Sequence, residues 1–222
     1  MKEIHDIFLW IHIPAGTLSL ILFWVPVIVK KGNNIHRKVG RAYYWCMWIV
    51  QITALILSVN NAFLGHYTMA AFLGFLAILT GYPLWYSYEI LQQKKVWTER
   101  YFKNRKVFAW VLFCASLSMI IGAAILKFQN QGVLMLLFGL LGLPAMKDAM
   151  MSKETAMNTG SRIKMHMQGT IISGIAAYTA FLSFGGRSLF EDHLPGYWQL
   201  LPWIAPTIIG VTVLRFMKNK YN

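Results

Sequence analysis

Residues 7–41 decide the fold of this chain: they read IFLWIHIPAGTLSLILFWVPVIV over 7–29 and KKGNNIHRKVGR over 30–41. The first part contains no Asp, Glu, Lys or Arg. A helix that crosses a bilayer needs about 20 consecutive, mostly apolar residues, and this part is long enough. The second part holds five cations, namely Lys30, Lys31, Arg37, Lys38 and Arg41. A membrane-length apolar run followed directly by a cationic loop predicts a transmembrane helix that ends in the cytoplasm.

The same alternation continues to the end of the chain. Apolar segments of membrane-spanning length occupy 7–29, 42–64, 67–91, 107–127, 131–147, 165–184 and 198–217. Eighteen of the 21 Lys and Arg residues fall in 30–41, 92–106, 147–164 and the tail from Arg215, and only Lys2, Lys127 and Arg187 lie on the other side. Cations gather on the cytoplasmic side of membrane proteins. The sequence therefore predicts an all-α, seven-helix transmembrane bundle in the cell inner membrane, with its N-terminus outside and its C-terminus in the cytoplasm.

Composition agrees with a membrane protein that forms one domain, residues 1–222. Apolar residues make up 57% of the chain and charged residues only 13%, whereas a soluble domain carries about 25% charged residues. The net charge of +13 is explained by cytoplasmic loops next to anionic lipid. Because the loops are short and no soluble domain remains, the lipid bilayer is the expected partner and nucleic-acid binding is not expected.

Polar and small residues form stripes at helical spacing on three of the predicted spans. The stripe in span 2 contains His36, Gly40, Tyr43, Met47, Gln51, Ala54 and Ser58, that in span 6 contains His166, Gly169, Thr170, Ser173, Ala177 and Ala180, and that in span 1 contains His12, Gly16 and Ser19. Lipid offers no hydrogen-bond partner, so we expect these stripes to face other helices. They are either close-packing faces or the lining of a binding site between spans 1, 2 and 6. In the second case His12, Gln51, Ser58 and Ser173 would contact the ligand.

Three ionisable residues are expected at the cytoplasmic ends of their spans. His36 and His166 lie in first helical turns, behind the possible caps Asn34 and Ser161, and Asp148 lies at the end of span 5. We expect spans 2, 5 and 6 to bring these three side chains into one neighbourhood. Two imidazoles and a carboxylate could bind a metal ion. Alternatively, the helix N-termini with Arg37, Arg41 and Arg162 could bind an anion, or the three residues could simply hydrogen-bond headgroups and loop backbone.

Haem binding is a further alternative. Axial pairs His12–His66 on the outside and His36–His166 on the inside would give the two-haem layout of small membrane cytochromes b. However, His36, His66 and His166 lie at predicted helix ends, whereas haem ligands normally lie deeper in a bundle.

Two motifs near the N-terminus resemble the start of a known bacterial family. They are H-x-x-x-G, from His12 to Gly16, and K-G-x-x-x-H-R-x-x-G-R-x-Y, from Lys31 to Tyr43. The family consists of membrane proteins described only as domain of unknown function 2306. Segments around 137–139 and 165–167 are also similar, so the resemblance covers about half of the chain. It implies a polytopic inner-membrane protein without an established activity, and it places four polar residues on matched elements: His12, His36, Asp148 and His166.

Familiar catalytic patterns are missing from the sequence. It contains no G-x-S-x-G, H-E-x-x-H or P-loop motif, and span 7 has no lysine that could hold retinal. Three function classes stay open. The chain could bind or transport a small molecule or ion between spans 1, 2 and 6, it could be a metal- or haem-dependent enzyme or redox protein, or it could be an accessory protein that acts through helix contacts with protein partners.

Overall fold

The computed structural model describes residues 2–93, 96–127, 131–159, 162–186 and 201–220. These residues contain helices and no β-strand, as predicted. The α-helices are α1 (Lys2–Ile28), α2 (Asn34–Phe63), α3 (Tyr67–Glu89), α4 (Glu99–Ile125), α5 (Gln131–Gly142), α6 (Ala145–Met150), α7 (Lys153–Thr159), α8 (Arg162–Ala180) and α9 (Leu201–Lys220). A 3-10 turn, Ile90–Gln92, extends α3, and a π-helical turn, Phe181–Gly185, extends α8.

Six segments of the described chain are long and apolar enough to cross a membrane. They are Glu3–Ile28, Asn34–Phe63, Tyr67–Gln92, Glu99–Ile125, Gln131–Met150 and Arg162–Gly185. The apolar part of α9, Leu201–Met217, is shorter. Many large apolar side chains on these helices point outward, such as Trp10, Ile28 and Phe63, each more than three-quarters exposed. An apolar outer surface of this kind is compatible with a multi-pass membrane protein.

Several helices differ from the predicted spans. α1 and α4 begin at Lys2 and Glu99, before the predicted starts at 7 and 107. α2 begins at Asn34, well before the predicted start of span 2 at 42, because the Asn33 side chain caps the helix by accepting a hydrogen bond from the His36 amide at 2.7 Å. The predicted span 131–147 is interrupted after Gly142, and α6 begins beyond Pro144. Pro144 has no amide hydrogen to donate to the carbonyl of Leu140, and a turn at Leu143 and Pro144 separates the two helices.

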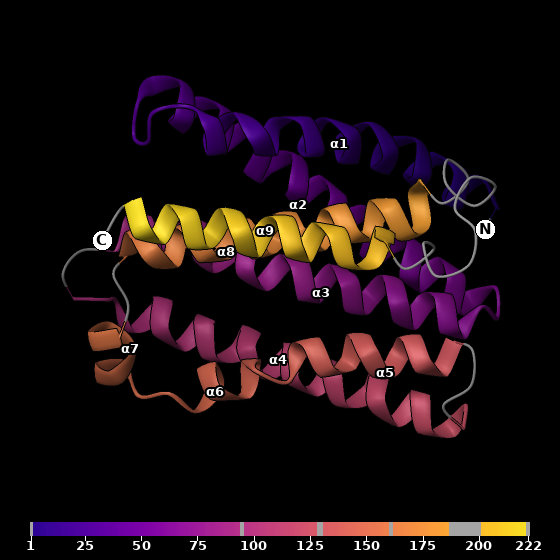
Figure 1. Cartoon of the computed structure of the whole chain (residues 1–222). Coiled ribbons are helices and arrows are strands. Elements are labelled where there is room, and N and C mark those ends of the chain that lie inside the picture. The colour runs from indigo at the N-terminus through magenta and orange to yellow at the C-terminus, as the bar shows by residue number, and fades with distance from the viewer. Residues whose placement is uncertain (1, 94–95, 128–130, 160–161, 187–200, 221–222) are drawn as a thin grey trace.

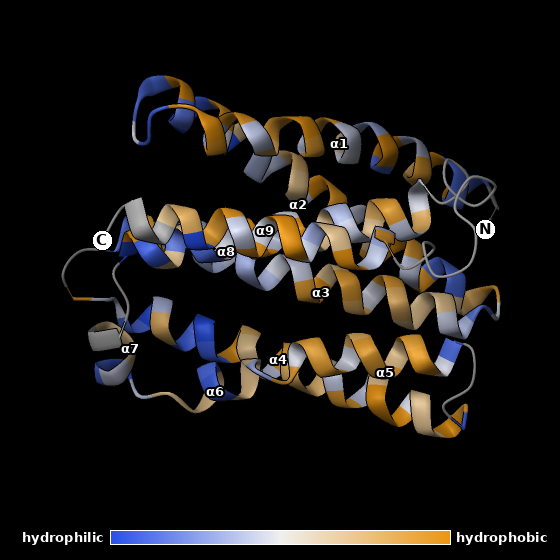
Figure 2. Cartoon of the chain, in the orientation of Figure 1, coloured by the Kyte–Doolittle hydropathy of each residue, from blue (hydrophilic) through white to orange (hydrophobic). Residues whose placement is uncertain are grey.

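α3 is the central helix and packs against α2, α4 and α8. α1 lies on α2, α5 and α6 lie on α4, and α9 lies on α8 (Figure 1). The α1–α2 turn, the start of α4, the short helix α7 and the end of α9 all lie at one end of the bundle. Hydrophilic residues gather there, as Figure 2 shows. The described parts of the cation-rich segments therefore lie at the same end of the bundle.

The predicted small and polar stripes on α2 and α8 face other helices. On α2, Tyr43, Met47 and Gln51 are buried, and on α8 Gly169 and Ser173 are buried. The expectation that these faces turn toward other helices is confirmed. Close approach of α8 to α3 at Gly169 brings the start of α8 beside the end of α3, and this contact positions the residues of the candidate site.

Candidate functional site

His36 and His166 lie close together at one end of the bundle, as predicted. The ring centroids of His36 on α2 and His166 on α8 are 6.4 Å apart, and the ring planes are inclined by 77°. His36 is held in the first turn of α2 by the cap at Asn33, one residue before the expected cap. The other expected cap, Ser161, lies outside the described residues. Residues 130 positions apart in the sequence thus share one end of the bundle.

Each imidazole is oriented by a backbone carbonyl in the last turn of a neighbouring helix. The His36 Nδ1 lies 3.1 Å from the carbonyl oxygen of Pro26 on α1, and the His166 Nδ1 lies 2.7 Å from that of Ser87 on α3. Carbonyls in the last turn of a helix lack partners within the helix, so they are free to accept these bonds. A carbonyl oxygen only accepts, and therefore both Nδ1 atoms carry the hydrogen.

The Nε2 atoms of both rings are consequently lone-pair donors in the neutral histidines. Within the described part of the chain, neither Nε2 of His36 or His166 has a hydrogen-bond partner. Histidines that bind metals are usually arranged in this way, with one ring nitrogen on the metal and the other donating to a carbonyl or carboxylate. The Nε2 atoms of His36 and His166 are therefore both available to donate an electron pair to an acceptor such as a metal ion.

Asp148 does not join the two histidines, so the predicted metal triad is not formed. Its Oδ1 lies 3.0 Å from Nη2 of Arg105 on α4, and its Oδ2 accepts a hydrogen bond from the Tyr82 hydroxyl at 2.8 Å. Among the described residues, no group of three or more His, Cys, Asp or Glu side chains could hold a metal ion.

Arg105 was not among the predicted site residues, because the sequence places it in a loop between two apolar segments. In the structure Arg105 lies in the second turn of α4, and its side chain is only 9% exposed, over the rings of Tyr86 and Trp97. A buried guanidinium needs a carboxylate partner, and Asp148 provides it. The spacing of Tyr101 and Arg105, four residues apart on one helix face, was the available signal.

The three predicted arginines do not surround the histidine pair. Arg37 and Arg41 have exposed side chains on the outer face of α2. Arg162 donates a hydrogen bond to the backbone carbonyl of Gln93 at the end of α3. Lys31 is the cation on the α1 side of the pair, and its Nζ donates to the carbonyls of Pro26 and Val27 at 2.6 Å each. The residues expected to bind an anion are thus directed to solvent or to helix ends.

The polar residues deeper in the spans each have a separate protein partner. His12 Nδ1 lies 2.8 Å from the hydroxyl of Thr53, Gln51 accepts from Thr80 at 2.8 Å, Ser58 donates to the carbonyl of Ala70 at 2.6 Å, and Ser173 shares a 2.9 Å hydrogen bond with Tyr43. Two of these bonds join α2 to α3, one joins α1 to α2 and one joins α2 to α8. The residues predicted to contact a ligand therefore connect helices in the structure.

Aromatic side chains fill the interior between α1, α2 and α8. The ring of Phe23 lies 5.7 Å from that of Tyr43 and 5.9 Å from that of Tyr178, centroid to centroid. Trp24 Nε1 donates to the Tyr178 hydroxyl at 2.7 Å, and this hydroxyl donates to the carbonyl of Leu20. The interior between these three helices is therefore occupied by aromatic side chains, and the histidine pair lies at one end of α2 and α8.

The outer-side haem pair gains no support from the geometry. His12 is engaged with Thr53, and His66 is exposed in the turn between α2 and α3.

Comparisons with protein-family models, with curated proteins and with solved structures found no match for this chain. The candidate site is thus defined by its own geometry: an imidazole pair at the junction of α1, α2, α3 and α8.

Proposed function

We propose that this chain is a seven-span protein of the cell inner membrane, with its N-terminus outside and its C-terminus in the cytoplasm. Six membrane-length segments supply six spans, and α9, with 20 residues and a length of about 30 Å, is the seventh. The described parts of the cation-rich segments lie at the end of the bundle where α9 ends (Figure 1), and hydrophilic residues gather at that end (Figure 2). This clustering supports a cytoplasmic location for that end.

Reporter fusions test this topology. Fusions after Lys38, Arg105 and the C-terminus are expected to report the cytoplasm, and fusions after Gly65 and Gly186 the outside, because the positive-inside rule places the cationic end inside. Alkaline phosphatase and fluorescent-protein fusions at each position provide the two complementary readouts. A cytoplasmic signal after Gly186 would contradict seven spans with this orientation.

We further propose that the protein binds one metal centre, a metal ion or a haem iron, through His36 and His166. The observation that carries this function is the donation of both Nδ1 hydrogens to backbone carbonyls, which leaves both Nε2 lone pairs for a shared acceptor. The site lies where α1, α2 and α8 meet α3. The proposed metal site therefore lies between the same spans for which the sequence predicts a ligand-binding site.

The separation of the rings supports a two-ligand centre. A bond between a metal and a histidine nitrogen is about 2.0–2.1 Å long. In the imidazole ring, with bonds of about 1.35 Å, each nitrogen lies about 1.15 Å from the ring centroid. Two imidazoles on opposite sides of one metal would then have centroids about 6.4 Å apart, whereas a tetrahedral angle would bring them to about 5.2 Å. The observed centroid separation of 6.4 Å leaves room for one metal ion between the two rings.

Two imidazole ligands restrict the choice of metal. Two-coordinate copper(I) and haem iron with two axial histidines both need only two protein ligands, and imidazole suits copper and iron. A structural zinc site needs four ligands, and the described residues offer no third side chain of the usual kinds near the pair. The proposed centre is therefore a copper ion or a haem.

Elemental analysis and an optical spectrum of the detergent-purified protein test the proposal. We expect one copper or iron per chain, and a Soret band if the centre is haem. His36→Ala and His166→Ala should each lower the affinity for the metal by at least about tenfold, because each removes one of two ligands. His66→Ala, in an exposed turn, is the matched control and should retain the metal. Unchanged metal content in both site variants would refute the assignment.

A further inference from the structure

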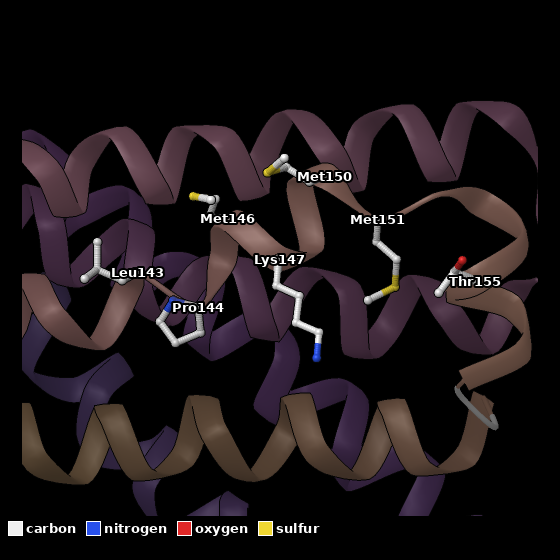
Figure 3. A pocket seen from close by; sticks show the side chains of 7 residues that line it. All are labelled: Leu143, Pro144, Met146, Lys147, Met150, Met151 and Thr155. Carbon is white, nitrogen blue, oxygen red and sulfur yellow. The ribbon is translucent and has the colours of Figure 1, made fainter.

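An open groove runs along the short helix α6 on the outside of the bundle. Figure 3 shows its lining, which consists of Leu143, Pro144, Met146, Lys147, Met150, Met151 and Thr155. The groove has a volume of about 580 Å³ and an almost entirely apolar surface. Three of the lining residues are methionines, whose flexible side chains adapt to apolar ligands of irregular shape.

The groove exists because the fifth membrane-length segment is broken. α5 ends at Gly142, a turn follows at Leu143 and Pro144, and α6 begins as a separate six-residue helix. The chain then turns at Met151 toward α7. An unbroken helix would present a continuous convex surface at this place.

One cation projects into this apolar surface. The Lys147 side chain extends away from the ribbon of α6, and its amino group is at the far end (Figure 3). Within the described part of the chain Lys147 has no ion pair, because the neighbouring carboxylate of Asp148 binds Arg105. Lys147 precedes the last residue of α6, Met150, by about 4.5 Å along the axis, so its ammonium can reach the level of the lipid headgroups.

We infer that the groove binds one anionic phospholipid. Leu143, Met146 and Met150 contact an acyl chain, and the Lys147 ammonium pairs with the phosphate. The assignment follows from the combination of an apolar channel, a cation without an internal counter-ion and a position at the end of a membrane-length segment. A membrane surrounds such a groove with molecules that have an acyl chain and a charged head, and the cation selects those with net negative charge. This inference is independent of the metal centre.

Lipid titrations of the full chain in detergent test the inference. Binding of phosphatidylglycerol and of phosphatidylcholine with the same acyl chains is compared by native mass spectrometry. We expect phosphatidylglycerol to bind about fivefold more tightly, which is the factor supplied by one lysine near an anionic headgroup. Lys147→Gln should abolish this preference. Lys103→Gln, which removes an exposed cation on α4, is the matched control and should retain it.

Three results would overturn the inference. The first is equal binding of the two lipids by the unmodified protein, and the second is an unchanged preference in Lys147→Gln. The third is an equal loss of preference in Lys103→Gln, which would show that the total charge, rather than this groove, attracts the lipid. A further variant, Met150→Glu, tests the apolar part, because its carboxylate should repel the lipid phosphate and lower phosphatidylglycerol binding below that of Lys147→Gln.

Discussion

Replacement of Arg105 with leucine is expected to lower the free energy of unfolding by about 3 kcal/mol. The guanidinium is 9% exposed and pairs with Asp148 at 3.0 Å, so the substitution leaves a carboxylate without its counter-ion in the bundle. Loss of one partner of a buried ion pair costs roughly 3–5 kcal/mol. The lower end applies here because Asp148 is 28% exposed and keeps its hydrogen bond from Tyr82. Denaturant titration of the detergent-purified protein measures the effect.

A double-mutant cycle separates the ion pair from general damage to α4. Asp148→Asn removes the charge that Arg105 neutralises, and the Arg105→Leu, Asp148→Asn double variant should recover most of the stability because no uncompensated charge remains. Lys103→Leu, an exposed cation two residues away on α4, should change stability by less than about 0.5 kcal/mol. Additive losses in the double variant would contradict a coupling between the two residues.

The arrangement of the bundle was predictable from the sequence where it depends on polarity. Cations at Lys30, Lys94 and Lys153 mark segments between apolar runs, and this spacing alone predicts helices of membrane length. The buried faces of α2 and α8 followed from small and polar residues at helical spacing, such as Gly169 and Ser173, because lipid cannot satisfy such groups.

The meeting of His36 and His166 was predictable for the same reason, since both residues begin a buried face at the same end of the molecule. The position of Asp148 was not. Its partner was decided by Arg105, a residue whose burial depends on how α4 packs against α3 and on the cover that Trp97 provides. A single sequence shows which residues are charged, but competition between partners depends on tertiary distances.

The carbonyl partners of the two histidines were equally hidden from sequence analysis. Pro26 and Ser87 participate only through backbone atoms, which carry no signal in the residue type. What makes them acceptors is their place in the last turns of α1 and α3. The two histidines alone therefore allow a metal site to be predicted from the sequence. Their tautomer, which leaves each Nε2 free for a metal, follows only from the structure.

Replacement of Gly169 with alanine is expected to destabilise the protein by about 1–3 kcal/mol through overpacking. A Cβ atom at this position on α8 would lie 2.6 Å from the carbonyl oxygen of Pro83 and 2.7 Å from side-chain atoms of Tyr86 and Ser87. The carbonyl belongs to the backbone of α3 and cannot turn aside, so the two helices must separate. Denaturant titration in detergent measures the loss.

The same substitution is expected to weaken the proposed metal site. His166 lies one turn before Gly169 and bonds the carbonyl of Ser87, so separation of α8 from α3 should lengthen that bond. Gly40→Ala is the matched control: its Cβ would meet only Pro26, at 3.9 Å, and alanine should stabilise the helix by about 0.5–1 kcal/mol. Equal changes in stability for the two variants would show that α8 does not approach α3 at Gly169. A stable Gly40→Ala protein that binds metal, beside a destabilised Gly169→Ala protein that does not, would tie the metal site to the contact between α3 and α8.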